Sequence, residues 1–448
     1  MASLRIGFAK VDITPPLCIP YLSHYPRQTP FEGVHDPLFA RAMVADNGRV
    51  RLAIVSADSL GFSRDVLGPT RDFLAEFRQR VERRARVPAA HVMLAATHAH
   101  STPQTTHITR LLDAPEAGPW LEMLLEQLAS AVVQAAAQLR PATLRAGLGE
   151  ARGIGWCRRI IGKDGKIYRL PDRPPDDQIA SEPRDDRVGV LIAQDNGGRV
   201  GTLLNFTCHP TTVQVNPLVS ADFPGVACDL VERAANGAPC LFLQGAAGNV
   251  NPVRHTTGFN DVRTYGRMLA DEANKVAAAL SGAKPMSDTL AVVGETLMLP
   301  TRADLPPAEE TLRRYVETRR AIDAAKTEAE RQKAIAAFRP WNEKKRLLDL
   351  GAGPVPCEVQ VMRLGEAVIA ANPGEMFCDF GLEIKQRSPA RLTFVSAYTN
   401  GYIGYLPVPE AWQQGGYEPS QGPWTRCGPD AGRKVTEKTV ELIQRVWK

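Results

Sequence analysis

The sequence predicts an α/β protein, a single large domain in which a mixed, largely buried β-sheet is flanked by helices. Short apolar runs of strand type alternate with helical patterns along the whole chain of 448 residues. Most of these runs are apolar throughout, which is typical of strands that are buried on both faces. Neither a fixed-period repeat nor a low-complexity tract interrupts this order. Residues 1–448 are therefore interpreted as one domain with insertions.

The elements follow one another in a regular order. Residues 51–61 and 91–97 are expected to be buried strands, and 64–86 and 120–139 helices, the latter with the strongest helical pattern of the chain. Further strands are expected at 189–194, 200–206, 239–244, 290–299, 357–363, 366–371 and 391–398. Further helices are expected at 223–236, 258–281 and 375–386.

Three segments depart from this alternation. Residues 157–188 are polar and rich in proline, which predicts a long surface loop that could form one wall of a site. Residues 307–347 are charged and rich in alanine, which predicts a solvent-exposed helical hairpin inserted before the last strands. Residues 400–430 are rich in Gly, Pro, Tyr and Trp and are expected to be irregular but well packed.

The composition excludes several classes of function. Lys and Arg number 54 and Asp and Glu 49, and a net charge of +5 is too small to indicate a nucleic-acid partner. The eight cysteines include no CxxC pair, so neither a zinc finger nor a disulfide framework is expected. The chain has no signal-type leader and no long apolar run, which predicts a cytoplasmic protein without membrane insertion. The sequence leaves open whether the protein is a homo-oligomer.

Three of the eight histidines lie in the string THAHSTPQTTH at residues 97–107. His98 and His100 follow an apolar strand, and a spacing of two places both on the same side of an extended chain. A hydrogen-bonded pair that stiffens the strand exit is the alternative. His209 follows a second apolar strand, and Pro210 stops that strand. Two strands that end in histidines indicate a metal site, since zinc enzymes use three such ligands and leave one position open.

Three carboxylates lie at strand or helix boundaries. Glu375 and Asp222 precede expected helices, where capping and compensation of the helix dipole are the alternative roles. Asp58 could orient a histidine from behind, as a hydrogen-bond acceptor. The segment 241–252, LFLQGAAGNVNP, leads a strand into a glycine-rich loop but lacks the signatures of phosphate and dinucleotide binding. A GxSxG nucleophile motif is also lacking.

Taken together, these motifs resemble the N-terminal catalytic domain of the neutral/alkaline ceramidase family. The resemblance covers nearly the whole chain, through VDITPP (11–16), VHDPLFARAMV (34–44), VSADSLG (55–61), ATHAHSTP (96–103), NFTCHPT (205–211), SADFPG (220–225), LQGAAGNVNP (243–252), NPGEMF (372–377) and NGYIGYLP (400–407). The family consists of zinc-dependent amidohydrolases. The resemblance therefore implies one Zn²⁺ per chain, held by His98, His209, Glu375 and Tyr405. It also implies that His100, Arg158 (with Arg159 as the alternative) and Tyr417 are active-site residues.

The chain departs from the family where the ceramidases carry a serine with an assigned catalytic role. Their GDVSPN string reads GNVNPV here, so Asn249 and Asn251 replace the aspartate and the serine. Asn251 is therefore expected to orient the substrate. The chain ends close to where the catalytic domain ends, so the C-terminal immunoglobulin-like domain of the full-length enzymes is not expected.

The resulting hypothesis is a hydrolase that cleaves a carboxamide with metal-activated water. The expected substrate is an amide or ester that is smaller or more polar than a sphingolipid. The alternatives are an esterase or lactonase, a carbohydrate-directed enzyme with the same metal site, and a metal-binding protein without turnover. Whether a second ion binds near His35, Asp36 and Asp58 is left open.

Overall fold

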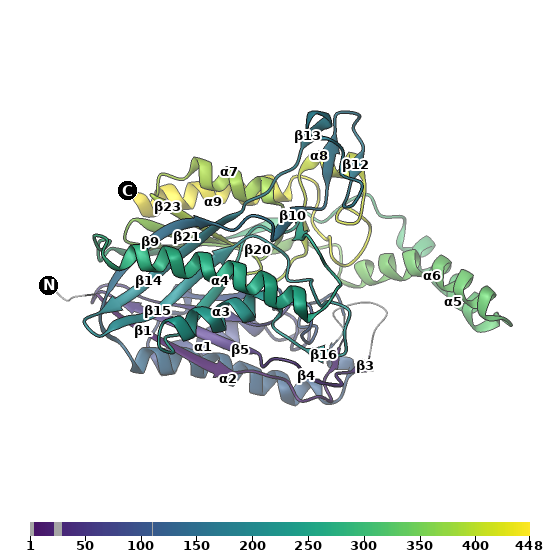
Figure 1. Cartoon of the computed structure of the whole chain (residues 1–448). Coiled ribbons are helices and arrows are strands. Elements are labelled where there is room, and N and C mark those ends of the chain that lie inside the picture. The colour runs from purple at the N-terminus through teal and green to yellow at the C-terminus, as the bar shows by residue number, and fades with distance from the viewer. Residues whose placement is uncertain (1–3, 22–28, 110) are drawn as a thin grey trace.

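The computed structural model describes residues 4–21, 29–109 and 111–448, and its strands form three main sheets (Figure 1). The first sheet has the order β7-β6-β5-β1-β8, with bounds Val92–Ala96, Arg51–Ala57, Phe39–Asp46, Arg5–Asp12 and Arg140–Pro141. The second has the order β17-β15-β14-β9, with bounds Cys240–Gln244, Gly198–Phe206, Arg187–Asp195 and Thr143–Glu150. The third has the order β19-β20-β21-β23, with bounds Leu290–Leu299, Val355–Leu364, Ala367–Ala371 and Leu392–Ser396. The α/β class is thus confirmed, with the strands divided among three sheets.

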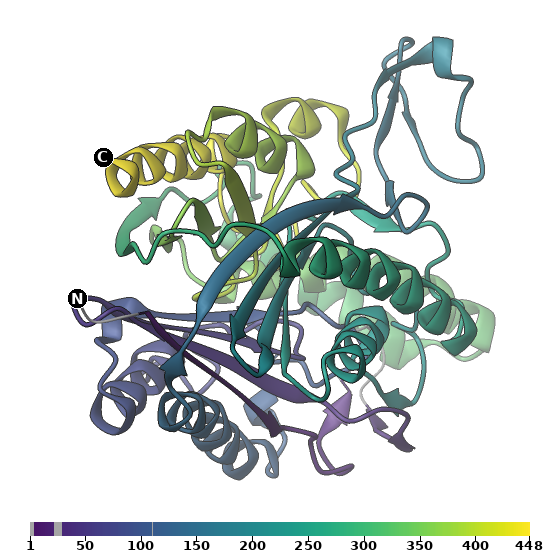
Figure 2. The same ribbon diagram turned by 60° about the vertical axis from the view of Figure 1, so that its left-hand side comes forward.

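Each main sheet packs one face on a core shared by all three and the other face on its own pair of helices (Figure 2). The helix pairs are α1 (Phe73–Ala85) with α2 (Ala117–Ala137), α3 (Asp222–Ala234) with α4 (Phe259–Ser281), and α7 (Cys378–Arg387) with α9 (Ala431–Trp447). A Cβ atom at Gly201 would lie 2.4 Å from the Phe8 ring, and one at Gly189 would lie 2.5 Å from Phe394. Glycine at these two positions allows the sheets to approach closely.

Every main sheet contains one parallel strand pair, and the three pairs meet at the centre of the molecule. The pairs are β6 with β7, β15 with β17, and β21 with β23. Backbone hydrogen bonds join their carboxyl ends: Ala397 N–H donates to Gln244 at 3.0 Å, and Ala96 N–H donates to Tyr398 at 3.1 Å. The side-chain amide of Asn205 donates to the carbonyls of Leu243 and Val395, both at 2.9 Å. The ends of these strands therefore occupy fixed positions relative to one another.

Two predicted helices begin later than the sequence suggested. The helix expected at 64–86 begins at Phe73, because the Asp72 side chain accepts a hydrogen bond from Ala75 N–H as an N-cap. The helix expected at 375–386 begins at Cys378. Glu375 instead lies in the short strand β22 (Glu375–Met376), paired in parallel with β24 (Tyr405–Leu406). The prediction that Glu375 begins a helix, and the capping role that depended on it, are therefore wrong.

The segment 157–188 is more ordered than the predicted loop. It contains β11 (Ile160–Gly162), β12 (Ile167–Tyr168) and β13 (Ile179–Ser181), which form a small sheet that projects from the main body (Figure 1). Isoleucines in this segment alternate with turn residues, and that pattern was hidden by its proline and charge content. Beside it, β10 (Gly155–Cys157) pairs with β18 (Val250–Pro252).

The predicted helical hairpin is confirmed as α5 (Ala308–Ala324) and α6 (Glu328–Asp349), which extend away from the sheets in Figure 1. Thr327 and Glu330 form a capping box at the start of α6. The remaining short elements are β2 (Pro20–Tyr21), β3 (Thr29–Pro30), β4 (Gly33–Val34), β16 (Leu218–Val219) and α8 (Pro409–Gln414). Among the described helices, none is long and apolar enough to cross a membrane.

A buried ion-pair network links the first sheet to α3. The Arg41 guanidinium is 2% exposed and donates to Asp58 at 3.0 Å and to Glu232 at 2.8 Å. Lys10 donates to the second oxygen of Glu232 at 2.7 Å. Asp58 also accepts the Phe39 N–H at 2.9 Å, and none of its recorded partners is a histidine. The expectation that Asp58 orients a histidine is therefore wrong, because its carboxylate balances Arg41.

Replacing Arg41 by methionine is expected to lower the free energy of unfolding by about 3–5 kcal/mol, because the buried Asp58 would lose its cation and Glu232 would keep only Lys10. Arg51→Met is the matched control on the neighbouring strand. The Arg51 side chain is 30% exposed and pairs with Asp46, so its loss should cost only about 1 kcal/mol or less. Urea unfolding of both variants measures the difference. Equal costs for the two variants would contradict the role given to Arg41.

Candidate metal centre

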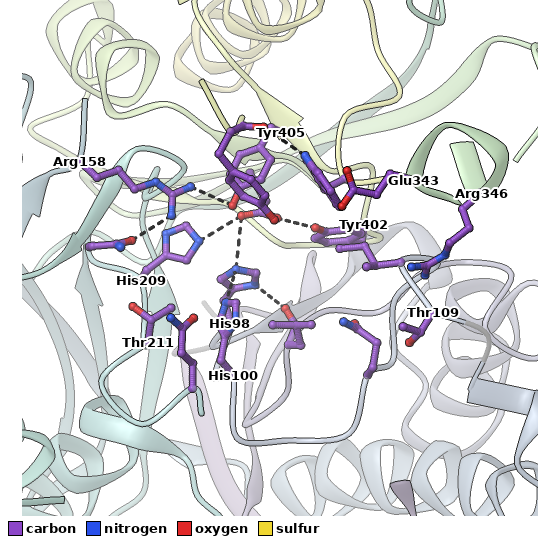
Figure 3. A pocket seen from close by; sticks show the side chains of 18 of the residues that line it. His98, His100, Thr109, Arg158, His209, Thr211, Glu343, Arg346, Tyr402 and Tyr405 are labelled. Atoms are coloured by element: carbon purple, nitrogen blue, oxygen red, sulfur yellow. Dashed lines mark hydrogen bonds and ion pairs between the residues drawn. The ribbon is translucent and has the colours of Figure 1, made fainter. Parts of the chain in front are cut away.

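The loops that leave the three parallel strand pairs converge on one cavity (Figure 3). The end of β7 leads to His98 and His100, and the end of β15 leads to His209. The ends of β21 and β23 lead to Glu375 and Tyr405. Every sequence-predicted metal ligand therefore lines this cavity, whose volume is about 260 Å³.

His98 has an unusual backbone conformation. Its φ of 66° lies in the left-handed region, where a residue other than glycine is uncommon. Two hydrogen bonds keep His98 in this conformation. Its backbone N–H donates to the Ser59 carbonyl at 2.9 Å, and its ring Nδ1–H donates to the Leu60 carbonyl at 2.6 Å. Both carbonyls belong to the loop after β6, the parallel partner of β7. The ring is therefore fixed with its Nε2 atom directed into the cavity.

His209 is fixed in the same way from the second sheet. Its backbone N–H donates to Val250 at 2.9 Å, and its Nδ1–H donates to the Ala247 carbonyl at 2.5 Å. The Nε2 atom is left facing Glu375. Burial lowers the pKa of His209 to about 4, although the neighbouring Glu375 opposes this shift. The imidazole is thus neutral at pH 7, which is the form that can bind a metal.

Glu375 joins the two histidines. Its Oε2 atom lies 3.1 Å from Nε2 of His209 and 3.4 Å from Nε2 of His98. Its Oε1 atom accepts a hydrogen bond from the Tyr402 hydroxyl. Burial by itself would raise the pKa of Glu375, but His98 and His209 hold this pKa well below its usual value. Two imidazoles and one carboxylate therefore converge on a common point.

His100 belongs to the same cluster. Its Nε2 atom lies 3.2 Å from Nε2 of His98. One candidate ligand atom from each of His98, His100 and His209 lies within 4.8 Å of the other two. This is the one such group of His, Cys, Asp and Glu found in the described part of the chain. The donor chemistry fits zinc, which binds imidazole nitrogen and carboxylate oxygen.

Arg158 forms the wall of the cavity beside His209. Its guanidinium donates to Glu418 at 2.8 Å, Asn251 at 3.0 Å, the Gly248 carbonyl at 2.8 Å and the Tyr405 hydroxyl at 2.9 Å. Arg159 points elsewhere, toward Gly415 and the other oxygen of Glu418. Of the two arginines that the sequence left open, Arg158 is therefore the one in the cavity.

Asn249 and Asn251, the two asparagines of the GNVNPV string, have different surroundings. The Asn249 side chain accepts the Cys378 N–H at 2.7 Å and donates to Asp379 at 3.0 Å, so it supports the start of α7. Asn251 lines the cavity, and its Oδ1 accepts the bond from Arg158. The Nδ2 group of Asn251 makes no hydrogen bond to any described residue.

Tyr417 lies at the mouth of the cavity, where it is 44% exposed. Its ring stacks on Trp424 with centroids 5.0 Å apart and meets the Tyr405 ring edge-on at 5.8 Å. Figure 3 also shows Tyr402 beside the cluster, on the opposite side from Arg158. Tyr402 was present in the NGYIGY string, but sequence reasoning gave it no role.

Sequence reasoning also missed the part that α6 plays in the cavity. Although α6 was predicted to be solvent-exposed, its second half lines the cavity with Arg339, Asn342, Glu343 and Arg346. The Arg339 guanidinium donates to Glu343 at 3.0 Å. Figure 3 shows Glu343 and Arg346 directed toward the metal cluster from the side of α6. The charged pattern of α6 could not reveal this, since it is equally typical of a helix facing water.

Comparison with solved structures places this fold among the ceramidases. A structure described as neutral ceramidase from Pseudomonas aeruginosa matches with a TM-score of 0.72 at 20% identity, covering 99% of this chain and 75% of that chain. A structure described as ceramidase complexed with C2 matches with a TM-score of 0.72 at 19% identity and the same coverage. No curated protein sequence matches the chain.

The sequence profile of the neutral/alkaline non-lysosomal ceramidase N-terminal domain matches residues 4–283, well over half of the chain. The protein therefore belongs to the neutral/alkaline ceramidase family, whose members are hydrolases of non-peptide carbon–nitrogen bonds. The resemblance inferred from the motifs is thus confirmed.

The acidic residues outside the cluster have other partners. His35 Nδ1 lies 2.5 Å from Asp36 Oδ1, and the His35 ring stacks on Phe259. The described residues include no metal-type cluster at His35, Asp36 and Asp58.

Asp222 is the first residue of α3, and its carboxylate accepts the N–H groups of Phe223 at 2.6 Å and Val213 at 3.2 Å.

Asp222 is expected to make stability fall as pH rises. Burial raises the pKa of Asp222 to about 6, from an ordinary value of 3.8, so the folded chain binds the proton more tightly than the unfolded chain. Its contribution is full below about pH 4 and is lost as pH rises through about 6, up to about 3 kcal/mol in all. Urea unfolding between these pH values, for wild type and Asp222→Asn, isolates this slope. Parallel curves for the two proteins would contradict the assignment.

Proposed function

We propose that the protein is a zinc-dependent amidohydrolase with one Zn²⁺ held by His98, His209, Glu375 and Tyr405. The observation that carries this proposal is the convergence of two histidine Nε2 atoms on one carboxylate oxygen, at 3.1 and 3.4 Å. Both histidines have Nδ1 engaged by backbone carbonyls, as is usual for metal-ligating histidines. Tyr405 enters the set through the resemblance to the ceramidase family, and its strand pairs in register with that of Glu375.

When bound, zinc polarises a carbonyl and lowers the pKa of a coordinated water toward 7. The protein's own groups would then orient the amide and stabilise charge on its oxygen. Arg158 has four hydrogen-bond partners, so it is held rigidly in the wall. The Nδ2 group of Asn251 and the Tyr417 hydroxyl are donors available to the substrate. His100 would hydrogen-bond water or substrate beside His98.

The lining of the cavity supports a substrate more polar than ceramide. Leu60 and Ile108 are its aliphatic side chains, and three tyrosines and Trp424 add aromatic surface, whereas imidazole, amide, hydroxyl and charged groups make up the remainder. The long hydrocarbon chains of a sphingolipid would need apolar surface to leave water, and here they would meet polar groups that lose hydration. We therefore propose small, polar amides as the substrates, with esters of similar shape as a secondary class.

His98→Ala is expected to abolish zinc binding and hydrolysis together, because it removes a ligand held by a strained backbone. Purified wild type should carry about one equivalent of zinc by plasma mass spectrometry, as a single site requires. His91→Ala is the control, since His91 directly precedes β7, at the end of the strand opposite to His98, and bonds the Arg51 carbonyl. His100→Ala should keep the metal if the ligand set is as proposed. Wild type without metal after reconstitution would exclude the proposed function.

Asn251→Ala is expected to lower kcat/KM for the best amide of a screened panel by roughly 100-fold, because one donor to the reacting amide is lost. The zinc content should stay unchanged, which separates a substrate contact from a ligand. Asn260→Ala, an exposed asparagine on α4, is the control. Full activity of Asn251→Ala would refute the role of Asn251.

A further inference from the structure

A second cavity adjoins the metal cavity across a shared wall. Its volume is about 460 Å³, and Arg158, Asn251 and Tyr417 line both cavities. The rest of this second cavity is lined, among others, by Trp156 of β10, by Arg169 between β12 and β13, and by His255 after β18. An amide bond positioned at the wall would have space for one half of the molecule on each side.

The charges that face the second cavity are positive. Arg169, Arg254 and Arg158 line it, and Glu418 is its one acidic side chain among the described residues. Glu418 is fully buried, and both of its oxygens already accept hydrogen bonds from Arg158 and Arg159. It therefore leaves no negative charge to balance the other arginines.

Arg169 is the cation of this cavity that lacks a counterion. The carboxylate of Asp261 lies 3.4 Å from Arg254 and partly compensates its charge, and the Arg254 side chain is 67% exposed. Arg169 is also exposed to solvent, and it has no ion-pair partner in the part of the chain that the structure describes. Its side chain comes from the segment 157–188, between β12 and β13. Burial, Arg158 and Arg169 together lower the pKa of His255, which leaves this imidazole neutral at pH 7.

We propose that the second cavity binds a carboxylate carried by one half of the substrate amide, with Arg169 as its recognition residue. A single guanidinium without a counterion matches a monoanion, and its planar fork can donate two parallel hydrogen bonds to a carboxylate. The proposal rests on the proposed function, because the proposed function places the scissile amide at the wall formed by Arg158 and Asn251. It specifies the substrates as carboxylate-bearing amides.

Two pairs of probes test the charge on each half of the amide. N-Hexanoylglycine and N-hexanoylglycinamide differ in charge on the amine half, and N-hexylsuccinamate and N-hexylsuccinamide differ on the acyl half. Calorimetry measures their binding to the full-length protein after treatment with a chelator, so that turnover does not intervene. The charged member of at least one pair should bind about tenfold more tightly at low ionic strength.

Arg169→Gln should reduce this preference to less than about threefold, and added salt should weaken the preference in wild type. Arg152→Gln is the matched control, since Arg152 is 74% exposed, pairs with Glu150 and lies outside the cavity. The control should keep the wild-type preference. Equal binding within both pairs, or a preference that survives in Arg169→Gln, would overturn the proposal. Because binding is measured without turnover, a failure of hydrolysis would not be mistaken for a failure of this site.

Discussion

The candidate metal centre depends on the contact between three parallel strand pairs at the centre of the molecule. Parallel strands place their carboxyl ends at the same edge, and here three such edges from three sheets are joined by backbone hydrogen bonds. The Asn205 side chain adds a link, because it donates to two strands of different sheets. The loops that follow these strands thus begin at fixed positions. Groups from distant parts of the sequence can therefore be held at fixed separations.

Within this frame, each histidine is oriented by the loop of a neighbouring strand. The carbonyl that accepts from His98 follows β6, and the carbonyl that accepts from His209 follows β17. Neither ring can rotate without losing a buried hydrogen bond, which would cost about 1–3 kcal/mol. The left-handed φ of His98 adds strain that only such surroundings can sustain. Glu375 presents a carboxylate oxygen to the Nε2 atoms of both rings, and a cation bound among these three acceptor groups would compensate its buried charge.

The sequence predicted the histidines of this centre for a physical reason. His98 and His209 each follow an apolar strand directly, and the position of a strand end is the most regular feature of an α/β fold. Glu375 and Tyr405 follow turns and short bridges, so their positions came from the resemblance to a family. The partner of Asp58 was missed because Arg41 lies on another strand, 17 residues away, and strand order cannot be derived from local patterns. The inward-facing residues of α6 were missed because a helix pattern does not reveal what it faces.

The metal centre and the walls around it have different origins in the chain. The candidate ligands come from the loops of the three sheets, whereas α6 and the segment 157–188 supply Arg339, Glu343, Arg346 and Arg169. The two insertions can vary in length and charge without altering the sheets, since they pack outside the shared core. Because the ligands are fixed by the sheets, a change of charge in an insertion would alter which molecule is admitted and leave the ligand geometry intact. The polar and cationic residues of these insertions are thus the physical reason to expect a substrate other than a sphingolipid on a ceramidase fold.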